Sequence, residues 1–286
     1  VLFARRNWKL GRIDRKGALR VAGLRFLLAL LTWVGFVHAV PDDAMFSLTQ
    51  HAVASWLLSG AVIWILYLAL EPSVRARWPH SIVTWNRILA GRWLDAQVGS
   101  HVLIGAAVGC VLWQLFVLPD ILLGHNDKLS GTGGLAFVQG TRQWVGGHAG
   151  RLADGLTVGL GFFFALFFLR TLLKRDWLAA VVASLLGIWI EGAVVYSTNW
   201  KLTAAIYFVV YFALFLVMLR FGLVATISCI FFVNSFNSLV LGFDWSTWYA
   251  PYGLATLLMM LTIAFGSFWR SLGSRNIFSA DAAEAA

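Results

Sequence analysis

Charged side chains are scarce in this chain. Only 12% of its 286 residues are Asp, Glu, Lys or Arg, whereas 60% are hydrophobic. A soluble domain carries about a quarter charged residues and less than about half apolar ones. The apolar residues are also grouped into runs of roughly 18 to 25 residues, and each run is long enough to cross a hydrocarbon core of about 30 Å as a helix. The composition therefore excludes an ordinary soluble globular domain.

Strict alternation of apolar and polar residues is also missing. Backbone that crosses lipid must satisfy its polar groups internally, as a helix or a closed barrel, and barrel strands alternate at every second residue. The run from Phe162 to Leu169 is apolar at every position. The sequence therefore predicts an all-α fold, a polytopic transmembrane helix bundle.

Catalytic and metal-binding motifs are lacking as well. There is no Gly-x-Ser-x-Gly elbow and no kinase signature, and Gly131–Gly134 lacks the Lys-Ser/Thr of a phosphate-binding loop. Cys110 and Cys229 fall inside apolar runs, which is typical of small core residues. The histidines show no metal-ligand spacing, although a single axial ligand of a haem or chlorophyll-type pigment would leave none. The sequence therefore indicates no catalytic residue and no metal site, and it leaves any cofactor unknown.

Eight apolar runs are expected to span the membrane. They cover residues 21–39, 49–70, 101–123, 155–173, 177–196, 202–219, 221–242 and 250–269. If consecutive spans alternate in direction, 18 of the 22 Lys and Arg residues fall on one side and 4 on the other. The positive-inside rule then places both termini in the cytoplasm, and we expect a bacterial cytoplasmic (inner) membrane. The predicted parts are a basic cytoplasmic segment (1–20), a transmembrane domain (21–270) and a cytoplasmic tail (271–286).

Two connections between the predicted spans are longer than turns. In the first, Ile82, Trp85, Leu89 and Trp93 recur at helical spacing. This pattern predicts a helix near 78–95 that lies in the membrane interface. The second connection, at 124–154, is rich in glycine and is expected to be an outer loop, either re-entrant or a lid.

Basic side chains around the first connection are candidate contacts of anionic lipid headgroups. They are Arg75, Arg77, Arg87 and Arg92. The net charge of +9 is assigned in this way to the membrane surface, and no nucleic-acid partner is expected. Trp177 and Trp200 lie at predicted span ends, where indole rings prefer the headgroup region.

One carboxylate, Glu191, lies well inside a predicted span. An ionised carboxylate in hydrocarbon is costly, so we expect it to face the bundle interior, to pair or to stay protonated. Asn234 and Asn237, with Ser235 and Ser238, are candidate hydrogen-bond partners from another span. These residues form either an intramembrane polar site for a ligand, a proton or a subunit, or a structural network between helices.

Short sequence anchors extend from the first residues of the chain to its last. They include Ala4-Arg5-Arg6-Asn7, Asp14–Ala18, Tyr67–Pro72, Trp78-Pro79-His80, Leu89–Arg92, Trp248–Ala250 and Ser271-Leu272-Gly273. In these anchors the chain resembles the C-terminal multi-pass membrane region of bacterial (acidobacterial-type) serine/threonine protein kinases. The central spans resemble that family only in hydropathy, and Asp95-Ala96-Gln97 and Ser100-His101 depart from its pattern.

The resemblance implies a kinase parent whose catalytic domain precedes this region, so no catalytic residue carries over to this chain. We expect further sequence upstream, because Val1–Ala4 followed by Arg5 and Arg6 is typical of the end of an apolar helix. The first functional hypothesis is a non-catalytic anchor or sensor module of a receptor-like kinase. The alternative is a non-catalytic accessory subunit of a respiratory or photosynthetic complex; both imply protein partners within the membrane. A transporter is disfavoured by the lack of internal repeats.

Overall fold

The computed structural model of the protein describes residues 14–38, 43–122, 136–190, 197, 199–240 and 246–273. Within these ranges the chain is helical and has no strand, which confirms the predicted fold class. The elements are α2 (Arg15–Phe36), α3 (Asp43–Arg77), the 3-10 helix η1 (Pro79–Ile82), α4 (Val83–Leu89), α5 (Ala96–Leu122), α7 (Thr141–Leu173), α8 (Asp176–Ile190), α10 (Trp200–Phe221), α11 (Leu223–Asn237) and α12 (Ala250–Ser271).

Six helices are long and apolar enough to cross a membrane, namely α2, α3, α5, α7, α10 and α12. The apolar helices α8 and α11 have 15 residues each. That is about 22 Å of helix, which is shorter than a hydrocarbon core of about 30 Å. They occupy the predicted spans at 177–196 and 221–242, and residues 191–196 and 241–242 of those spans lie outside the described ranges. The protein is thus a multi-pass helical bundle, and six of the eight predicted spans contain a full-length apolar helix within the described residues.

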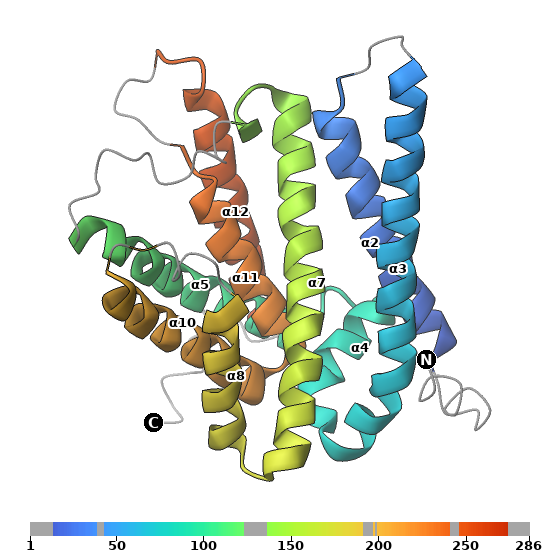
Figure 1. The fold of residues 1–286 in the computed structure, drawn as a ribbon, viewed down its shortest axis with the longest axis vertical. Coiled ribbons are helices and arrows are strands. Elements are labelled where there is room, and N and C mark those ends of the chain that lie inside the picture. The colour runs from blue at the N-terminus through green and yellow to red at the C-terminus, as the bar shows by residue number, and fades with distance from the viewer. Residues whose placement is uncertain are drawn as a thin grey trace, which may run out of the picture.

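Helix α7 lies at the centre of the bundle and packs against α2, α8 and α11 (Figure 1). A Cβ atom at Gly35 of α2 would lie only 2.6 Å from the Cα atom of Gly146 in α7. Further along this contact, Arg25 donates a hydrogen bond from Nε to Oγ1 of Thr157 at 3.0 Å. Since one residue number falls as the other rises, α2 and α7 run antiparallel.

Helix α5 packs against α11 through Gly105 and Gly109. A Cβ at either glycine would collide with the backbone of α11, at Ala225 and Cys229 respectively. Two small residues four apart let helix backbones approach closely in a membrane. Both residue numbers rise together, so α5 and α11 run parallel. This relation, like the antiparallel pair of α2 and α7, is the one that strictly alternating spans require.

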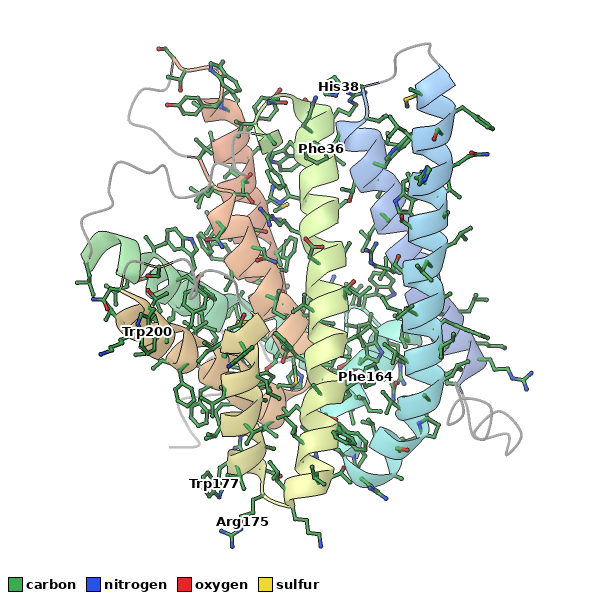
Figure 2. The ribbon with its side chains drawn as sticks, viewed as in Figure 1. Phe36, His38, Phe164, Arg175, Trp177 and Trp200 are labelled. Atoms are coloured by element: carbon green, nitrogen blue, oxygen red, sulfur yellow. The ribbon has the colours of Figure 1, made fainter. Side chains whose placement is uncertain are left out.

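The two ends of the bundle are marked in Figure 2. Phe36 and His38 lie at one end, and Arg175 and Trp177 lie at the opposite end. We call the latter the basic end; it also contains η1, since Trp78, the residue just before η1, lies beside Arg170 near the end of α7. Trp200 lies at an intermediate height, because α10 runs obliquely to α7.

The predicted outer loop at 124–154 is wrong in its second half. Helix α7 begins at Thr141, so residues 141–154 are helical. Gly146 and Gly150 lie in the contact with α2, where Gly150 faces Thr32. Glycines at a close helix contact look like loop glycines by composition alone, and this explains the error. Of the remaining loop, the structure describes residues 136–140.

Two helices extend beyond their predicted limits towards the basic end. Helix α2 begins at Arg15, because the Asp14 carboxylate caps it by accepting a hydrogen bond from the Gly17 N–H at 2.8 Å. Residues 15–20 of the predicted basic segment are therefore helical and continuous with α2. Helix α3 continues through Pro72 to Arg77 instead of ending at residue 70. Neighbouring groups in membrane proteins compensate for the missing proline N–H, so such helices tolerate proline.

The predicted interfacial helix near 78–95 is shorter and more deeply packed than expected. Its helical part ends at Leu89, since Gly91 has a φ of +80° that terminates the helix. Trp93 falls beyond this point and is 66% exposed, whereas Trp85 is only 5% exposed. The elements η1 and α4 contact helices α2, α3, α5, α10 and α11. They therefore form part of the bundle at its basic end.

Candidate functional site

Glu71 is a buried carboxylate near the basic end of α3. Its side chain is only 3% exposed and forms an ion pair of 2.5 Å with Arg75, one helical turn further on. The Arg75 side chain is 56% exposed, so the pair links the interior of the bundle to its surface. A charge held in this way is costly to bury and marks a functional candidate. Sequence reasoning missed Glu71 because the predicted span ended at residue 70.

Two further polar groups lie beside Glu71 in a cavity of about 10 Å³. Tyr67 and Trp85 line this cavity together with Glu71. The Tyr67 hydroxyl and the Trp85 indole N–H are buried and interact with each other, but neither makes a hydrogen bond of standard geometry within the described part of the chain. A space of about 10 to 15 Å³ with several polar groups around it suits one water molecule. The arrangement can therefore bridge α3 and α4 through a single water.

The start of α2 is attached to this region at two points. The backbone of Asp14, the cap of α2, lies against Glu71, where its N–H favours the Glu71 carboxylate although the two carboxylates repel each other. One turn into the helix, Arg20 donates a hydrogen bond to the carbonyl oxygen of Leu89, the last residue of α4. These contacts connect the first residues of α2 to both α3 and α4. A shift of α4 against the bundle would therefore change the contacts of the first residues of α2.

Trp78 fixes η1 on α7. It is 1% exposed, and its ring stacks on Phe163 with a centroid distance of 5.2 Å and an interplanar angle of 11°. The guanidinium of Arg170 lies 4.9 Å from the Trp78 ring centroid and donates to Asp176 at 2.6 Å. The indole N–H donates to Nε2 of His80 at 2.8 Å. Stacking on Phe163 and the cation–π contact with Arg170 hold this side chain in one position.

The turn between α10 and α11 closes the same region. Gly222 has a φ of +82°, and a Cβ there would collide with the backbone of Ser81 in η1. Only glycine adopts this conformation without strain and permits such an approach. Ser81 is fully buried, and its hydroxyl donates to the Trp78 carbonyl at 2.7 Å. Thus η1 is held from the side of α11 as well.

The four predicted headgroup contacts divide into two kinds. Arg75 and Arg87 form ion pairs within the protein, Arg87 with Asp95 at 2.6 Å. The hydrogen bond from Arg87 lowers the pKa of Asp95 below its ordinary value. Arg77 and Arg92 are exposed, in agreement with a surface role.

The predicted site around Glu191 is not brought together by the described residues. Glu191 itself lies outside the described ranges. Asn234 is half-buried and lines a cavity of about 210 Å³ together with residues such as Phe116, Phe162 and Tyr211. Asn237 is the last residue of α11 and is exposed. Asn237 does not line this cavity.

A second polar cluster lies at the opposite end of the bundle. The Thr256 hydroxyl donates to the Tyr252 carbonyl at 3.0 Å and accepts from the Trp144 indole at 2.9 Å. Since this hydroxyl proton is used, the Nε2 of His148, 3.1 Å from the same oxygen, acts as a donor. Nδ1 of His148 is buried without a partner in the described part of the chain. The cluster links α7 to α12, and the predicted loop at 124–154 concealed it.

Arg151 adds a charge to the second cluster. Its Nε donates to the Ser238 hydroxyl at 3.0 Å, and its guanidinium lies 4.9 Å from the Phe137 ring centroid. A cation within a membrane helix requires such partners. Among the described residues, no three His, Cys, Asp or Glu side chains gather in a way that could hold a metal ion. This end is therefore a set of hydrogen bonds between helices.

Comparisons with models of protein families, with curated proteins and with solved structures found no significant match to this chain. The resemblance noted in the short sequence anchors thus stands on those residues alone. What the structure establishes is a multi-pass helical membrane protein with a buried carboxylate, Glu71, at its basic end.

Proposed function

We propose that the chain is the membrane-embedded anchor or sensor module of a receptor-like serine/threonine protein kinase and is itself non-catalytic. The kinase part of this proposal rests on the sequence anchors. The module part rests on one structural observation, the double attachment of the start of α2 to Glu71 of α3 and to Leu89 of α4. A cytoplasmic domain joined before α2 would be coupled through these contacts to the packing of the bundle.

The proposal places the basic end at the cytoplasmic face of a bacterial inner membrane, with both termini inside. Its support is the charge distribution: the exposed cations Arg77, Arg92 and Arg175 lie at the end where α3 and α7 finish. Cytoplasmic segments near span ends carry an excess of Lys and Arg. Anionic lipid headgroups are the partners that these side chains would meet.

The proposed mechanism is a change in helix packing that reaches α2 through α4. A signal in the membrane would shift α4 against the bundle and so alter the contacts of Arg20 and Glu71. Coupling between sites typically amounts to about 1 to 3 kcal/mol, or roughly fivefold to 150-fold in an equilibrium. The hydrogen bond from Arg20 to Leu89 and the backbone contact of Asp14 with Glu71 are sufficient for an effect of this size.

The full-length protein encoded around this chain provides the test. It is reconstituted in vesicles and given labelled ATP and a generic acceptor protein. We expect phosphate transfer, and a change of about fivefold or more in its rate for Glu71→Gln. Asp176→Asn is the matched control, because it removes a carboxylate of a more exposed ion pair at the same end.

Absence of phosphate transfer would refute the kinase assignment, and equal rates for Glu71→Gln and wild type would refute the coupling. Co-purification with a stoichiometric multi-subunit respiratory or photosynthetic assembly, without phosphate transfer, would support the accessory-subunit alternative.

A further inference from the structure

An apolar groove of about 290 Å³ lies between α2 on one side and α5, α11 and α12 on the other. We call it the lateral groove. Its lining includes Leu24, Leu28, Leu156, Ile227, Phe231 and Ile263. The volume is at the lower limit of those that hold small organic ligands.

The lateral groove offers no polar partner to a ligand. Its one hydroxyl, that of Ser228, already donates to the Val102 carbonyl at 2.9 Å. The Trp85 indole N–H interacts with Tyr67, which lines the small cavity beside Glu71. A polar ligand would lose its hydration without compensation, so the groove selects an apolar chain.

The side of the groove between α2 and α12 is open. Helix α2 packs against α3, α4 and α7, whereas α12 packs against α5, and no extensive packing within the described ranges joins α2 to α12. Leu24 is correspondingly 40% exposed although it lines the groove. A ligand can therefore enter sideways from the lipid.

The length of the groove matches one leaflet. Its lining residues on α11 extend from Val224 to Phe232, which is about 12 Å of helix. Half of a hydrocarbon core is about 15 Å. Trp85 and Ile88 of α4 form the end nearest the basic end of the bundle.

Cations surround that end of the groove. Arg20 lies one turn before Leu24 and donates to the Leu89 carbonyl, next to Ile88. Arg92 follows α4 and is exposed, and Arg270, also exposed, lies against Gly99 at the start of α5. Asp95, a carboxylate of the same region, is neutralised by its ion pair with Arg87. The mouth of the groove is therefore positive.

We infer that the lateral groove binds one acyl chain of an anionic phospholipid from the leaflet at the basic end. The chain fills the apolar space, and the phosphate group lies among Arg20, Arg92 and Arg270. Because α4 and the start of α2 both border the groove, the lipid stabilises the contact between Arg20 and Leu89. The inference rests on the membrane-spanning fold and not on the proposed kinase assignment.

Lipid retention by the purified chain tests this inference. The protein is extracted in mild detergent, offered phosphatidylglycerol or phosphatidylcholine of identical chains, and weighed by native mass spectrometry. We expect one retained phosphatidylglycerol per protein and little phosphatidylcholine. Leu24→Trp should fill the groove and abolish retention, whereas Leu27→Trp, on the same helix but outside the groove and 55% exposed, should retain the lipid.

The headgroup is tested separately. The double variant Arg20→Gln/Arg92→Gln should weaken binding of phosphatidylglycerol by about thirtyfold, the effect of removing two cations near a membrane surface. Lys174→Gln/Arg175→Gln removes two exposed cations from the turn after α7 and should leave binding unchanged. Equal retention of the two lipids, or equal loss in both double variants, would overturn the anionic assignment.

The position of the acyl chain is tested by photo-crosslinking of the wild-type protein, which requires no variant. A phosphatidylglycerol with a diazirine in its acyl chain should label residues 224–232 of the wild-type protein. Labelling confined to residues that do not line the groove, or a dimer that buries the groove without lipid, would refute the inference. Loss of kinase activity with lipid binding intact would refute only the proposed function.

Discussion

The two ends of the bundle are built with different chemistry. At the basic end, helices are joined by charged groups, and the three ion pairs of the described residues, Glu71–Arg75, Arg87–Asp95 and Arg170–Asp176, all lie there. At the opposite end, His148, Trp144 and Arg151 are joined to hydroxyl groups. Hydrogen bonds to buried hydroxyls fix one geometry, whereas ion pairs that reach the surface respond to neighbouring charge and to solvent. The comparison indicates a fixed end and an adjustable end.

The largest loss of stability is expected when Trp78 is replaced, because its side chain packs η1 against α7 at the basic end. Trp78→Ala removes a ring that is 1% exposed and stacked on Phe163. The cost should be about 3 to 5 kcal/mol, as for other buried aromatic truncations. Thermal unfolding in detergent measures it, with Trp93→Ala as the exposed control. A similar small loss for both variants would mean that η1 is not fixed on α7.

A smaller effect is expected at the opposite end for Thr256→Val. The substitution leaves the N–H groups of Trp144 and His148 without their acceptor. Unsatisfied buried donors cost about 1 to 3 kcal/mol. Thr262→Val is the control, since the Thr262 hydroxyl bonds only to its own helix and is exposed. If both substitutions were equally mild, the hydrogen bonds between α7 and α12 would not be stabilising.

Removing either partner of the Glu71–Arg75 ion pair should lower the stability of the protein by a different amount. Arg75→Gln leaves the buried carboxylate without its counter-charge and should cost about 1 kcal/mol, less than a fully buried pair because Arg75 is largely exposed. Glu71→Gln removes the buried charge together with its interaction with Asp14 and should cost less. Arg77→Gln, at an exposed neighbour, should have no effect. A larger loss for Glu71→Gln than for Arg75→Gln would contradict the assignment.

The smallest effect on stability is expected when Asp95 becomes protonated at low pH. Arg87 lowers its pKa below the ordinary value of 3.8, so the folded state favours the carboxylate. The resulting stability is present above that value and is lost as the pH falls through the lowered pKa. The difference in midpoint temperature between wild type and Asp95→Asn should therefore shrink below about pH 3.8. A difference that stays constant down to about pH 2 would show that the ion pair contributes nothing.

Much of the fold could be predicted from the apolar runs, whereas less of the candidate site could be predicted from the sequence. The lengths of these runs predicted the helical bundle, and the direction of α5 relative to α11 follows from the order of the spans. Glu71 was missed because the predicted span ended at residue 70, and His148 was missed because its neighbouring glycines suggested a loop. In both cases a contact with another helix decides the local structure, at Trp85 and at Gly35 respectively. Such tertiary contacts leave no periodic signal in a single sequence.

The proposed coupling requires that the basic end faces the cytoplasm. Cysteine labelling in intact bacterial cells tests this orientation directly. In a protein without Cys110 and Cys229, single cysteines replace Arg77 and Arg175 at the basic end and Arg142 near the start of α7, all exposed positions. A membrane-impermeant maleimide, given access to the periplasm, should label the cysteine at position 142 in intact cells and the other two only after the inner membrane is opened. Labelling at position 77 or 175 in intact cells would contradict the orientation and the coupling proposed from it.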